Sequence, residues 1–144
     1  MGFSMGASIA MVLACFDPTP DYIVPIVGHL HLASAIENAP IFWRTKRDLE
    51  RFGIDRQHRL EIFSRLGFEK LRPQLAPERQ LWIAARDDGF VTAPCVEQQW
   101  RAWGRPPIEW IPGGHTTFMF CLPHVVRRMK AFHAGLSAPQ SYVS

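Results

Sequence analysis

The stretch from residue 81 to residue 111 alternates between strand-like and helix-like patterns, and this alternation constrains the fold more than any other feature. Residues 81–85 are an apolar run of strand length, and residues 108–111 are a second such run. Between them, residues 91–103 have the apolar spacing of an amphipathic helix, which Gly104 ends. Two strands joined by one helix pair in parallel with a right-handed connection. The sequence therefore predicts an α/β fold with a mostly parallel sheet flanked by helices.

The flanking segments add further elements to this unit. Residues 5–16 are apolar on every side and predict a buried helix, and residues 22–27 predict a short strand in which Pro25 weakens the pattern. A terminal helix is expected to restart at Pro123. With 47% hydrophobic residues, a chain of this length can build one globular core but not two. We therefore treat residues 1–144 as one partial domain.

Residues 37–76 differ in character and predict a helical insert. Pro40 is placed to begin one helix and Gly53 to end it, and a second helix ends at Gly67. Residues 44–72 contain nine Lys or Arg and five Asp or Glu, so this insert holds the whole positive excess of a chain whose net charge is +3. Scattered charges of this kind predict a helical cap with a solvated basic face, although the excess would also suit a negatively charged substrate or surface.

Simple features exclude several classes of protein. The apolar start has no basic residue before it and is too short to cross a bilayer, which excludes a signal peptide and a transmembrane segment. Three widely spaced cysteines predict reduced, mostly buried thiols in a cytoplasmic protein. His29 and His31 could share one face of a strand, but no third ligand is spaced to join them, so no metal site is predicted.

Residues 2–6 read Gly-Phe-Ser-Met-Gly, which is the pattern G-x-S-x-G placed directly before a helix. A sharp turn from strand to helix holds such a serine on a strained bend, where bulky neighbours in place of the two glycines would clash. The start of the helix offers the backbone N–H of Met5 to a developing oxyanion. Because a serine hydroxyl needs a base to take its proton, the pattern predicts a histidine and an orienting acid later in the chain.

Asp88 and His115 meet this requirement. Asp88 lies in the loop after the strand at residues 81–85, and His115 lies in the Pro-Gly-Gly-His loop after the strand at residues 108–111. Because the carboxyl ends of neighbouring parallel strands open at the same edge of a sheet, we expect both side chains at that edge. Asp87 is the neighbouring alternative for the acid.

Together these features resemble the α/β-hydrolase-fold serine hydrolases, from the turn at residues 2–6 to the C-terminus. Members of that family commonly place their acid three residues before a Val that opens the next helix, as Asp88 stands before Val91. The resemblance implies that Ser4 is the nucleophile and that His115 is the general base and later the acid. It implies that Asp88 orients the imidazole, and it implies neither a cofactor nor a metal.

The same resemblance implies a reaction in which a Ser-His-Asp triad cleaves an ester or related acyl bond of a small-molecule substrate through an acyl-enzyme. Met5 would supply one oxyanion donor, and residues 37–76 would form a cap or lid over the site. Phe3, Phe42 and Trp43 would contact the substrate.

The start of the chain departs from the family pattern. Only Met1 precedes Gly2, so we expect neither a preceding strand nor the loop that carries the second oxyanion donor, and Ala7 stands where the family usually has a glycine. We therefore expect the C-terminal part of such a hydrolase, with no strand for the turn to leave from and with exposed apolar helix surface. We also expect poor solubility and weak or no hydrolase activity.

A function of another class is compatible with the same residues, namely a non-catalytic α/β remnant that acts as an interaction module through its basic insert. Nucleic-acid binding is not predicted, because the insert contains no recognisable module and no regular interleaving of aromatic with basic residues. The sequence sets neither the oligomeric state nor the identity of the substrate.

Overall fold

The computed structural model describes residues 1–137, in which a parallel sheet has its strands in the order β1-β2-β3-β4. The strands are β1 (Gly2–Phe3), β2 (Pro25–Ile26), β3 (Trp82–Ala85) and β4 (Ile108–Ile111). The longest pairing joins β3 to β4, from Trp82 opposite Ile108 to Ala85 opposite Ile111. The strand–helix–strand unit that the sequence predicts is therefore confirmed as a parallel pair.

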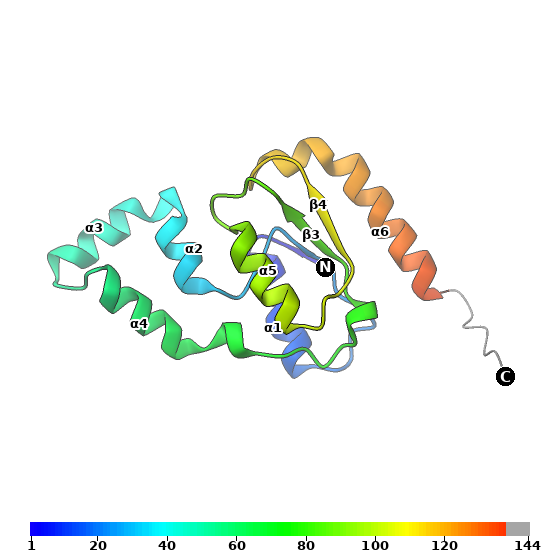
Figure 1. The fold of residues 1–144 in the computed structure, drawn as a ribbon, viewed down its shortest axis with the longest axis horizontal. Coiled ribbons are helices and arrows are strands. Elements are labelled where there is room, and N and C mark those ends of the chain that lie inside the picture. The colour runs from blue at the N-terminus through cyan, green and yellow to red at the C-terminus, as the bar shows by residue number, and fades with distance from the viewer. Residues whose placement is uncertain (138–144) are drawn as a thin grey trace.

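Helices of two kinds connect these strands (Figure 1). The α-helices are α1 (Met5–Phe16), α2 (Leu32–Asn38), α3 (Trp43–Arg51), α4 (Arg56–Leu66), α5 (Ala93–Ala102) and α6 (Leu122–Ser137). The 3₁₀ helices are η1 (Pro40–Phe42), η2 (Phe68–Lys70), η3 (Pro77–Arg79) and η4 (Thr117–Cys121). No helix within residues 1–137 is long and apolar enough to cross a membrane.

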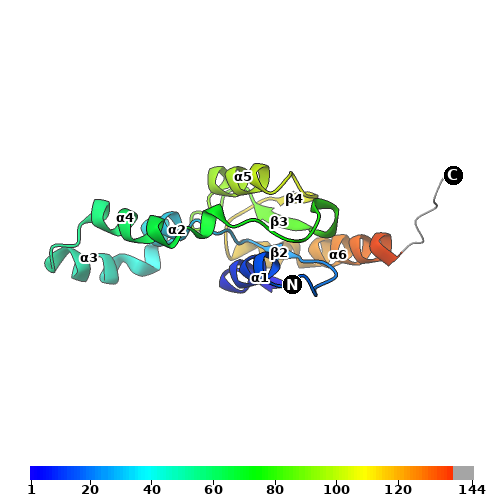
Figure 2. The ribbon, with the colours of Figure 1, turned by 90° about the horizontal axis from the view of Figure 1, so that it is seen from below.

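The two faces of the sheet pack against different helices. On β3, Trp82 and Ala84 belong to an apolar cluster with residues of α1 and α5, because alternate side chains of a strand point to opposite faces. Ile83 and Ala85 belong to a second cluster that includes Val125 of α6. Figures 1 and 2 accordingly show α6 on the side of the sheet opposite to α1 and α5. The sheet is thus the middle layer of three.

A short strand precedes the turn at Ser4, which corrects the expectation that the turn has no strand to leave from. The N–H of Gly2 donates to the carbonyl of Val24 at 3.2 Å, and the N–H of Ser4 donates to the carbonyl of Ile26 at 2.9 Å. These bonds pair β1 with β2 in parallel. Two residues are enough to anchor the turn because the neighbouring strand supplies the hydrogen-bond partners.

The strand predicted at residues 22–27 is shorter than expected. Only Pro25–Ile26 forms β2, while Ile23 makes a separate parallel bridge with Gln80. Proline has no N–H to donate, and Val27 lies in the left-handed region with φ 45°, so the regular ladder is interrupted on both sides. The chain nevertheless keeps its place beside β3, because the N–H of Val27 donates to the carbonyl of Ile83 at 2.8 Å.

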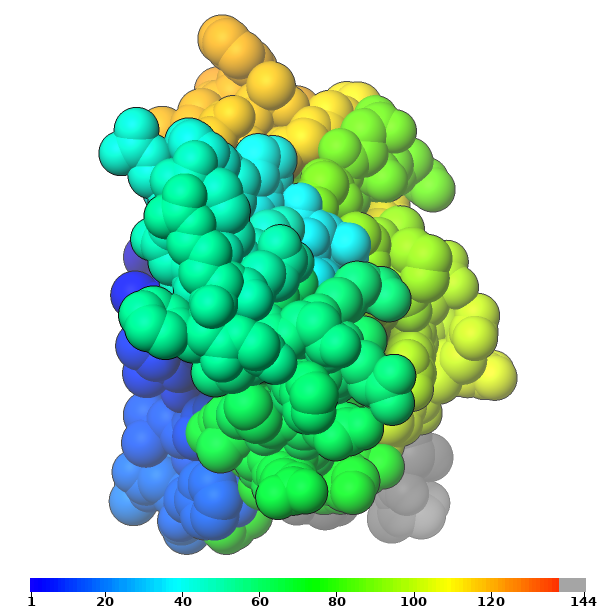
Figure 3. Space-filling view, turned by 90° about the vertical axis from the view of Figure 1, so that its left-hand side faces the viewer, coloured from blue at the N-terminus to red at the C-terminus, as the bar shows by residue number. Residues whose placement is uncertain are grey.

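Residues 32–70, from α2 to η2, form a helical arm that extends from the sheet on the side of α1 and α5 (Figures 1 and 2). It begins at Leu32, earlier than the insert predicted at residues 37–76. Seen end on, the arm lies across the body between α1 and α5 (Figure 3). A role as a cap or lid stays a prediction.

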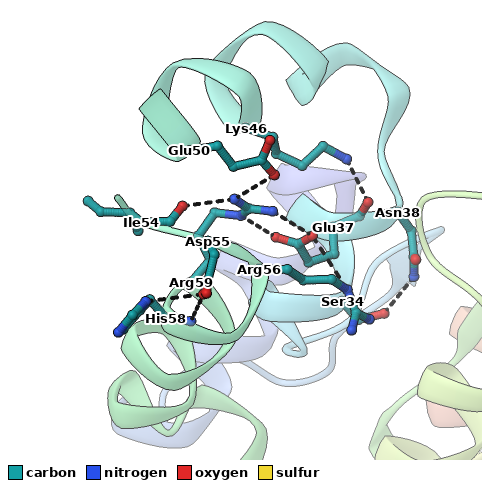
Figure 4. Close-up of polar contacts among 10 residues, drawn as sticks. All are labelled: Ser34, Glu37, Asn38, Lys46, Glu50, Ile54, Asp55, Arg56, His58 and Arg59. Carbon is teal, nitrogen blue, oxygen red and sulfur yellow. Dashed lines mark hydrogen bonds and ion pairs between the residues drawn. The ribbon is translucent and has the colours of Figure 1, made fainter. Parts of the chain in front are cut away.

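A buried arginine holds the arm together and is an exception to the solvated basic face that the sequence predicts, since most Lys and Arg residues of the insert are exposed (Figure 4). Arg59 is 2% exposed and donates to both carboxylate oxygens of Glu37, at 2.7 and 3.2 Å. Its remaining nitrogen donates to Glu50 at 3.2 Å and to the carbonyl of Ile54 at 3.0 Å. The hydrogen bonds from Arg59 to Glu37 hold the pKa of the Glu37 carboxyl below its usual value. Part of the positive charge of the insert is therefore structural.

The outer face of α1 is apolar and exposed, as expected for a helix that covers few strands. Met5, Ile9, Leu13 and Phe16 are 76%, 62%, 48% and 67% exposed. The opposite face of α1, with Ala7, Met11, Ala14 and Cys15, packs into the protein. The bounds of α1 that the sequence predicts are confirmed, but the helix buries only one side of its apolar surface.

The three cysteines are free thiols, as expected, but only Cys15 is buried. Burial raises the pKa of the Cys15 thiol to about 11, so it is protonated and unreactive at neutral pH. Cys95 and Cys121 are partly exposed, which corrects the expectation of mostly buried thiols.

Candidate active site

The turn at Ser4 joins β1 to α1 within a single residue. Ser4 has φ 52°, in the left-handed region that side-chain-bearing residues rarely adopt, so the backbone is strained where the hydroxyl is displayed. A Cβ atom at Gly2 would collide with the carbonyl of Gly6, whereas a Cβ at Gly6 would meet open space. The bend therefore requires only the first of the two glycines in the pattern.

Ser4, His115 and Asp88 form one continuous line of hydrogen bonds. The Oγ atom of Ser4 lies 2.8 Å from Nε2 of His115, and Nδ1 of His115 lies 2.8 Å from Oδ2 of Asp88. The side chain of Asp88 is fully buried and that of His115 is 12% exposed. The structure thus brings together three side chains that the sequence places in separate loops.

Asp88 rather than Asp87 contacts the imidazole, because the loop after β3 turns back on itself. The second carboxylate oxygen of Asp88 accepts the N–H groups of Phe90 and Val91, at 2.8 and 2.9 Å. Asp87 is exposed, and its N–H donates to the carbonyl of Gly113 at 3.0 Å. That bond ties the loop after β3 to the loop that carries His115.

Two phenylalanines pack on the imidazole. The ring of Phe90 stacks on His115 with centroids 4.9 Å apart, and the ring of Phe3 lies tilted at 5.7 Å. Phe3 in turn stacks on Phe118 at 4.5 Å. Aromatic contacts of this kind hold the imidazole in one orientation. Sequence reasoning missed Phe90 and Phe118, whose only signal is that they stand in or next to the loops that carry Asp88 and His115.

The first backbone N–H groups of α1 lie next to Ser4. Within residues 1–137, no backbone carbonyl accepts a hydrogen bond from the N–H of Met5 or Gly6. This is the normal state of a helix N-terminus, which carries a partial positive charge and binds anions. Met5 itself is 76% exposed.

An apolar pocket of about 300 Å³ lies beside the first turns of α1. Its lining comes from α1, from the start of α2 and the residues before it, and from η2: Met5, Ser8, Ile9, Val12, Leu30, Leu32 and Phe68. The one hydroxyl in the lining, that of Ser8, donates to the carbonyl of His29 at 2.7 Å. The pocket therefore suits an apolar group.

Phe42 and Trp43 lie in the helical arm, at the junction of η1 and α3. Their exposed fractions are 37% and 51%. The ring of Trp43 packs against the guanidinium groups of Arg44 and Arg47, each 5.1 Å from its centroid. These contacts are internal to α3, so a role for the two rings in binding a substrate stays a prediction.

His29 and His31 lie between β2 and α2. His29 is 2% exposed, and burial, with a smaller effect of His31, lowers its pKa to about 4. Burial also lowers the pKa of His31. Among the residues that the structure describes, no group of three or more His, Cys, Asp or Glu side chains is placed to hold a metal ion.

Neither a protein-family model nor a curated protein sequence matches this chain. Solved structures do match. An esterase from Pyrococcus furiosus aligns with a TM-score of 0.62 at 17% identity, covering 95% of this chain and 52% of that one. An acetyl xylan esterase from a Paenibacillus species aligns with 0.57 at 16% identity, covering 91% and 44%. A meta-cleavage product hydrolase from Pseudomonas fluorescens aligns with 0.55 at 14% identity, covering 93% and 63%.

This chain spans between 44% and 63% of the length of these three structures. Its parallel sheet with flanking helices aligns with theirs over at least 91% of its residues. The chain therefore has the α/β-hydrolase fold.

Proposed function

We propose that the protein is a serine hydrolase that cleaves an ester or related acyl bond of a small molecule. Ser4 is the nucleophile, His115 the general base and then the acid, and Asp88 the residue that orients the imidazole. The observation that carries this proposal is the continuous hydrogen-bond line from Ser4 Oγ through His115 to Asp88, with both contacts at 2.8 Å.

In the first half of the reaction, the proton of His115 is on Nδ1, where it donates to Asp88, and the Nε2 lone pair accepts the Ser4 hydroxyl. As Ser4 Oγ attacks the acyl carbonyl, its proton passes to Nε2 and a C–O bond forms. The carbonyl oxygen becomes negatively charged and accepts a hydrogen bond from the backbone N–H of Met5 at the start of α1. Asp88 stabilises the imidazolium that results.

In the second half, the tetrahedral intermediate breaks its bond to the leaving group, which takes the proton from His115 Nε2. This leaves the acyl group on Ser4 and the imidazole neutral again. Water then gives a proton to the same Nε2 and attacks the acyl carbonyl, and His115 returns the proton to Ser4 Oγ as the carboxylic acid departs. In deacylation, water takes the part that Ser4 Oγ takes in acylation, and Ser4 Oγ takes the part of the leaving group.

The surroundings of Ser4 support an apolar acyl or alcohol group in the substrate. The pocket beside α1 has an apolar lining, and its one hydroxyl is already hydrogen-bonded to backbone. Phe3 and Phe90 add aromatic surface around His115. The matched structures include proteins described as esterases. Phe42 and Trp43 lie in the helical arm, so they would complete the acyl pocket only if the arm closes over Ser4.

The experiment is covalent labelling of the purified 144-residue chain with a fluorophosphonate, which reacts with activated serines. We expect slow labelling that Ser4→Ala abolishes and that Ser137→Ala leaves intact, since Ser137 is an exposed residue at the end of α6. Absence of labelling, or labelling that persists in Ser4→Ala, would contradict the proposal. Fast labelling that depends on Ser4 would support the chemistry and contradict the expectation of a weak enzyme.

A further inference from the structure

We infer that Thr117 is a positioning residue, which holds the loop that presents His115 to Ser4. The inference rests on the function proposed above. Thr117 is the first residue of η4, and neither the sequence patterns nor the proposed reaction gives it a part.

The hydroxyl of Thr117 closes the loop that carries His115. The N–H of Gly114 donates to Oγ1 of Thr117 at 2.7 Å, and the same hydroxyl donates to the carbonyl of Gly114 at 3.2 Å. The first of these groups belongs to the peptide before Gly114 and the second to the peptide that joins Gly114 to His115. One side chain therefore holds the two peptides that lead into His115.

The turn before His115 is built closely around this hydroxyl. Gly113 has φ 88°, in the left-handed region that favours glycine. A Cβ atom at Gly113 would collide with Oγ1 of Thr117. The hydroxyl therefore occupies the space that a side chain at position 113 would need.

The same turn is joined to the loop that carries Asp88. The carbonyl of Gly113 accepts the N–H of Asp87 at 3.0 Å, and a Cβ atom at Gly114 would press against the carbonyl of Asp87. Asp87 directly precedes Asp88, whose Oδ2 lies 2.8 Å from Nδ1 of His115. A change in the shape of this turn therefore displaces the imidazole relative to the acid.

Phe118 anchors the loop on the side of the nucleophile. Its side chain is buried, and its ring stacks on Phe3 with centroids 4.5 Å apart. Phe3 directly precedes Ser4, so the residue after Thr117 has a fixed position relative to the nucleophile. The hydrogen bonds of Thr117 connect this fixed point to the loop of His115.

Two variants of Thr117 separate positioning from packing. Thr117→Val keeps the branched shape and removes the hydroxyl, whereas Thr117→Ser keeps the hydroxyl and removes a methyl group. Thr116→Val is the matched control, because Thr116 is also exposed and its side chain takes no part in these bonds. The first readout is the downfield NMR signal of the proton between His115 Nδ1 and Asp88 Oδ2, and the second is the fluorophosphonate labelling rate of Ser4.

We expect Thr117→Val to broaden the NMR signal and to label about threefold to tenfold more slowly, which is the factor that the loss of one hydrogen bond gives. Thr117→Ser and Thr116→Val should keep the signal and should label near the wild-type rate. Wild-type behaviour of Thr117→Val would overturn the inference. Equal losses in Thr117→Val and Thr117→Ser would also overturn it, because they would show a packing role, and so would an equal loss in Thr116→Val.

Failure of the proposed function is distinguishable from failure of this inference. A wild-type chain that shows the downfield signal but does not label would contradict the proposed hydrolase activity, while the NMR comparison of the variants would still decide the role of Thr117. For a wild-type chain that labels without a resolved signal, the labelling rates of the variants decide it. A wild-type chain that shows neither would overturn both.

Discussion

Ser4 Oγ and His115 Nε2 lie 2.8 Å apart although 111 residues separate them along the chain. Ser4 follows β1 and His115 follows β4, and these strands are at opposite ends of the strand order. The loop after β4 must therefore cross the carboxyl edge of the two middle strands to reach Ser4. The contact between Ser4 and His115 therefore forms only when all four strands are correctly paired.

Asp88→Asn should lower the rate of fluorophosphonate labelling on the order of 10³- to 10⁴-fold, because an amide cannot hold the His115 tautomer that leaves Nε2 free to accept a proton. Asp87→Asn is the matched control and should label near the wild-type rate, since the Asp87 side chain is exposed. Similar rates for the two variants, measured by gel fluorescence over time, would contradict the assignment of the acid.

Gly2→Ala should destabilise the protein by about 1–3 kcal/mol, because the new methyl group collides with the carbonyl of Gly6 and the turn must open. Gly6→Ala should be neutral or stabilising by up to about 1 kcal/mol, because it meets open space and favours the helix. Urea denaturation of both variants measures the difference. A cost in Gly6→Ala equal to that in Gly2→Ala would refute the steric argument.

The free energy of unfolding should fall as the pH falls from about 6.5 to 4, by about 3 kcal/mol from His29 alone. The pKa of His29 is about 4 in the folded protein against 6.5 for an exposed imidazole, so in this window the unfolded chain binds a proton that the folded chain does not. Above pH 6.5 both states are neutral at His29 and its contribution to the pH dependence vanishes.

His29→Met provides the control for this pH dependence, which urea denaturation at a series of pH values measures. The variant should show a flatter profile, in which His31 supplies what remains because its pKa is also lowered. Equal slopes for wild type and variant between pH 6.5 and 4 would show that His29 is not the buried group responsible.

Arg59→Met should loosen the helical arm without unfolding the sheet. The variant leaves the carboxylate of Glu37, whose side chain is 9% exposed, without its main partner. We expect limited proteolysis within residues 32–70 to become on the order of tenfold faster, because local opening becomes easier. Arg56→Met is the matched control, since Arg56 is 72% exposed and contacts Glu37 only at 3.8 Å. Equal cleavage of the two variants would contradict a structural role for Arg59.

Short-range patterns were enough to predict much of this protein. Each predicted element was recognised from a pattern that extends over only a few residues. These patterns are the apolar runs at residues 81–85 and 108–111 and the helical spacing at residues 91–103, which Gly104 ends. Parallel pairing followed from the helix between the two runs. Ser4 was singled out by the pattern G-x-S-x-G, and Asp88 and His115 by their place in the loops after the two predicted strands.

Other features depended on neighbours that are distant in sequence. β1 exists because Val24 and Ile26 accept its hydrogen bonds, and two residues alone carry no strand pattern. Arg59 reads as a surface residue of an amphipathic helix, and only the approach of Glu37 makes its burial favourable. Phe90 contacts His115 because two separate loops converge.

The sequence by itself determined the unit β3–α5–β4 and predicted the three side chains proposed to carry the chemistry, because periodicity, stops and loop positions depend on residues that are close together along the chain. Only the tertiary structure decided that Asp88 rather than Asp87 meets His115, that Gly2 rather than Gly6 is sterically required, and that His29 is buried, which lowers its pKa. These properties are distances between atoms of different segments, and such distances are set by packing and hydrogen bonding across the whole sheet.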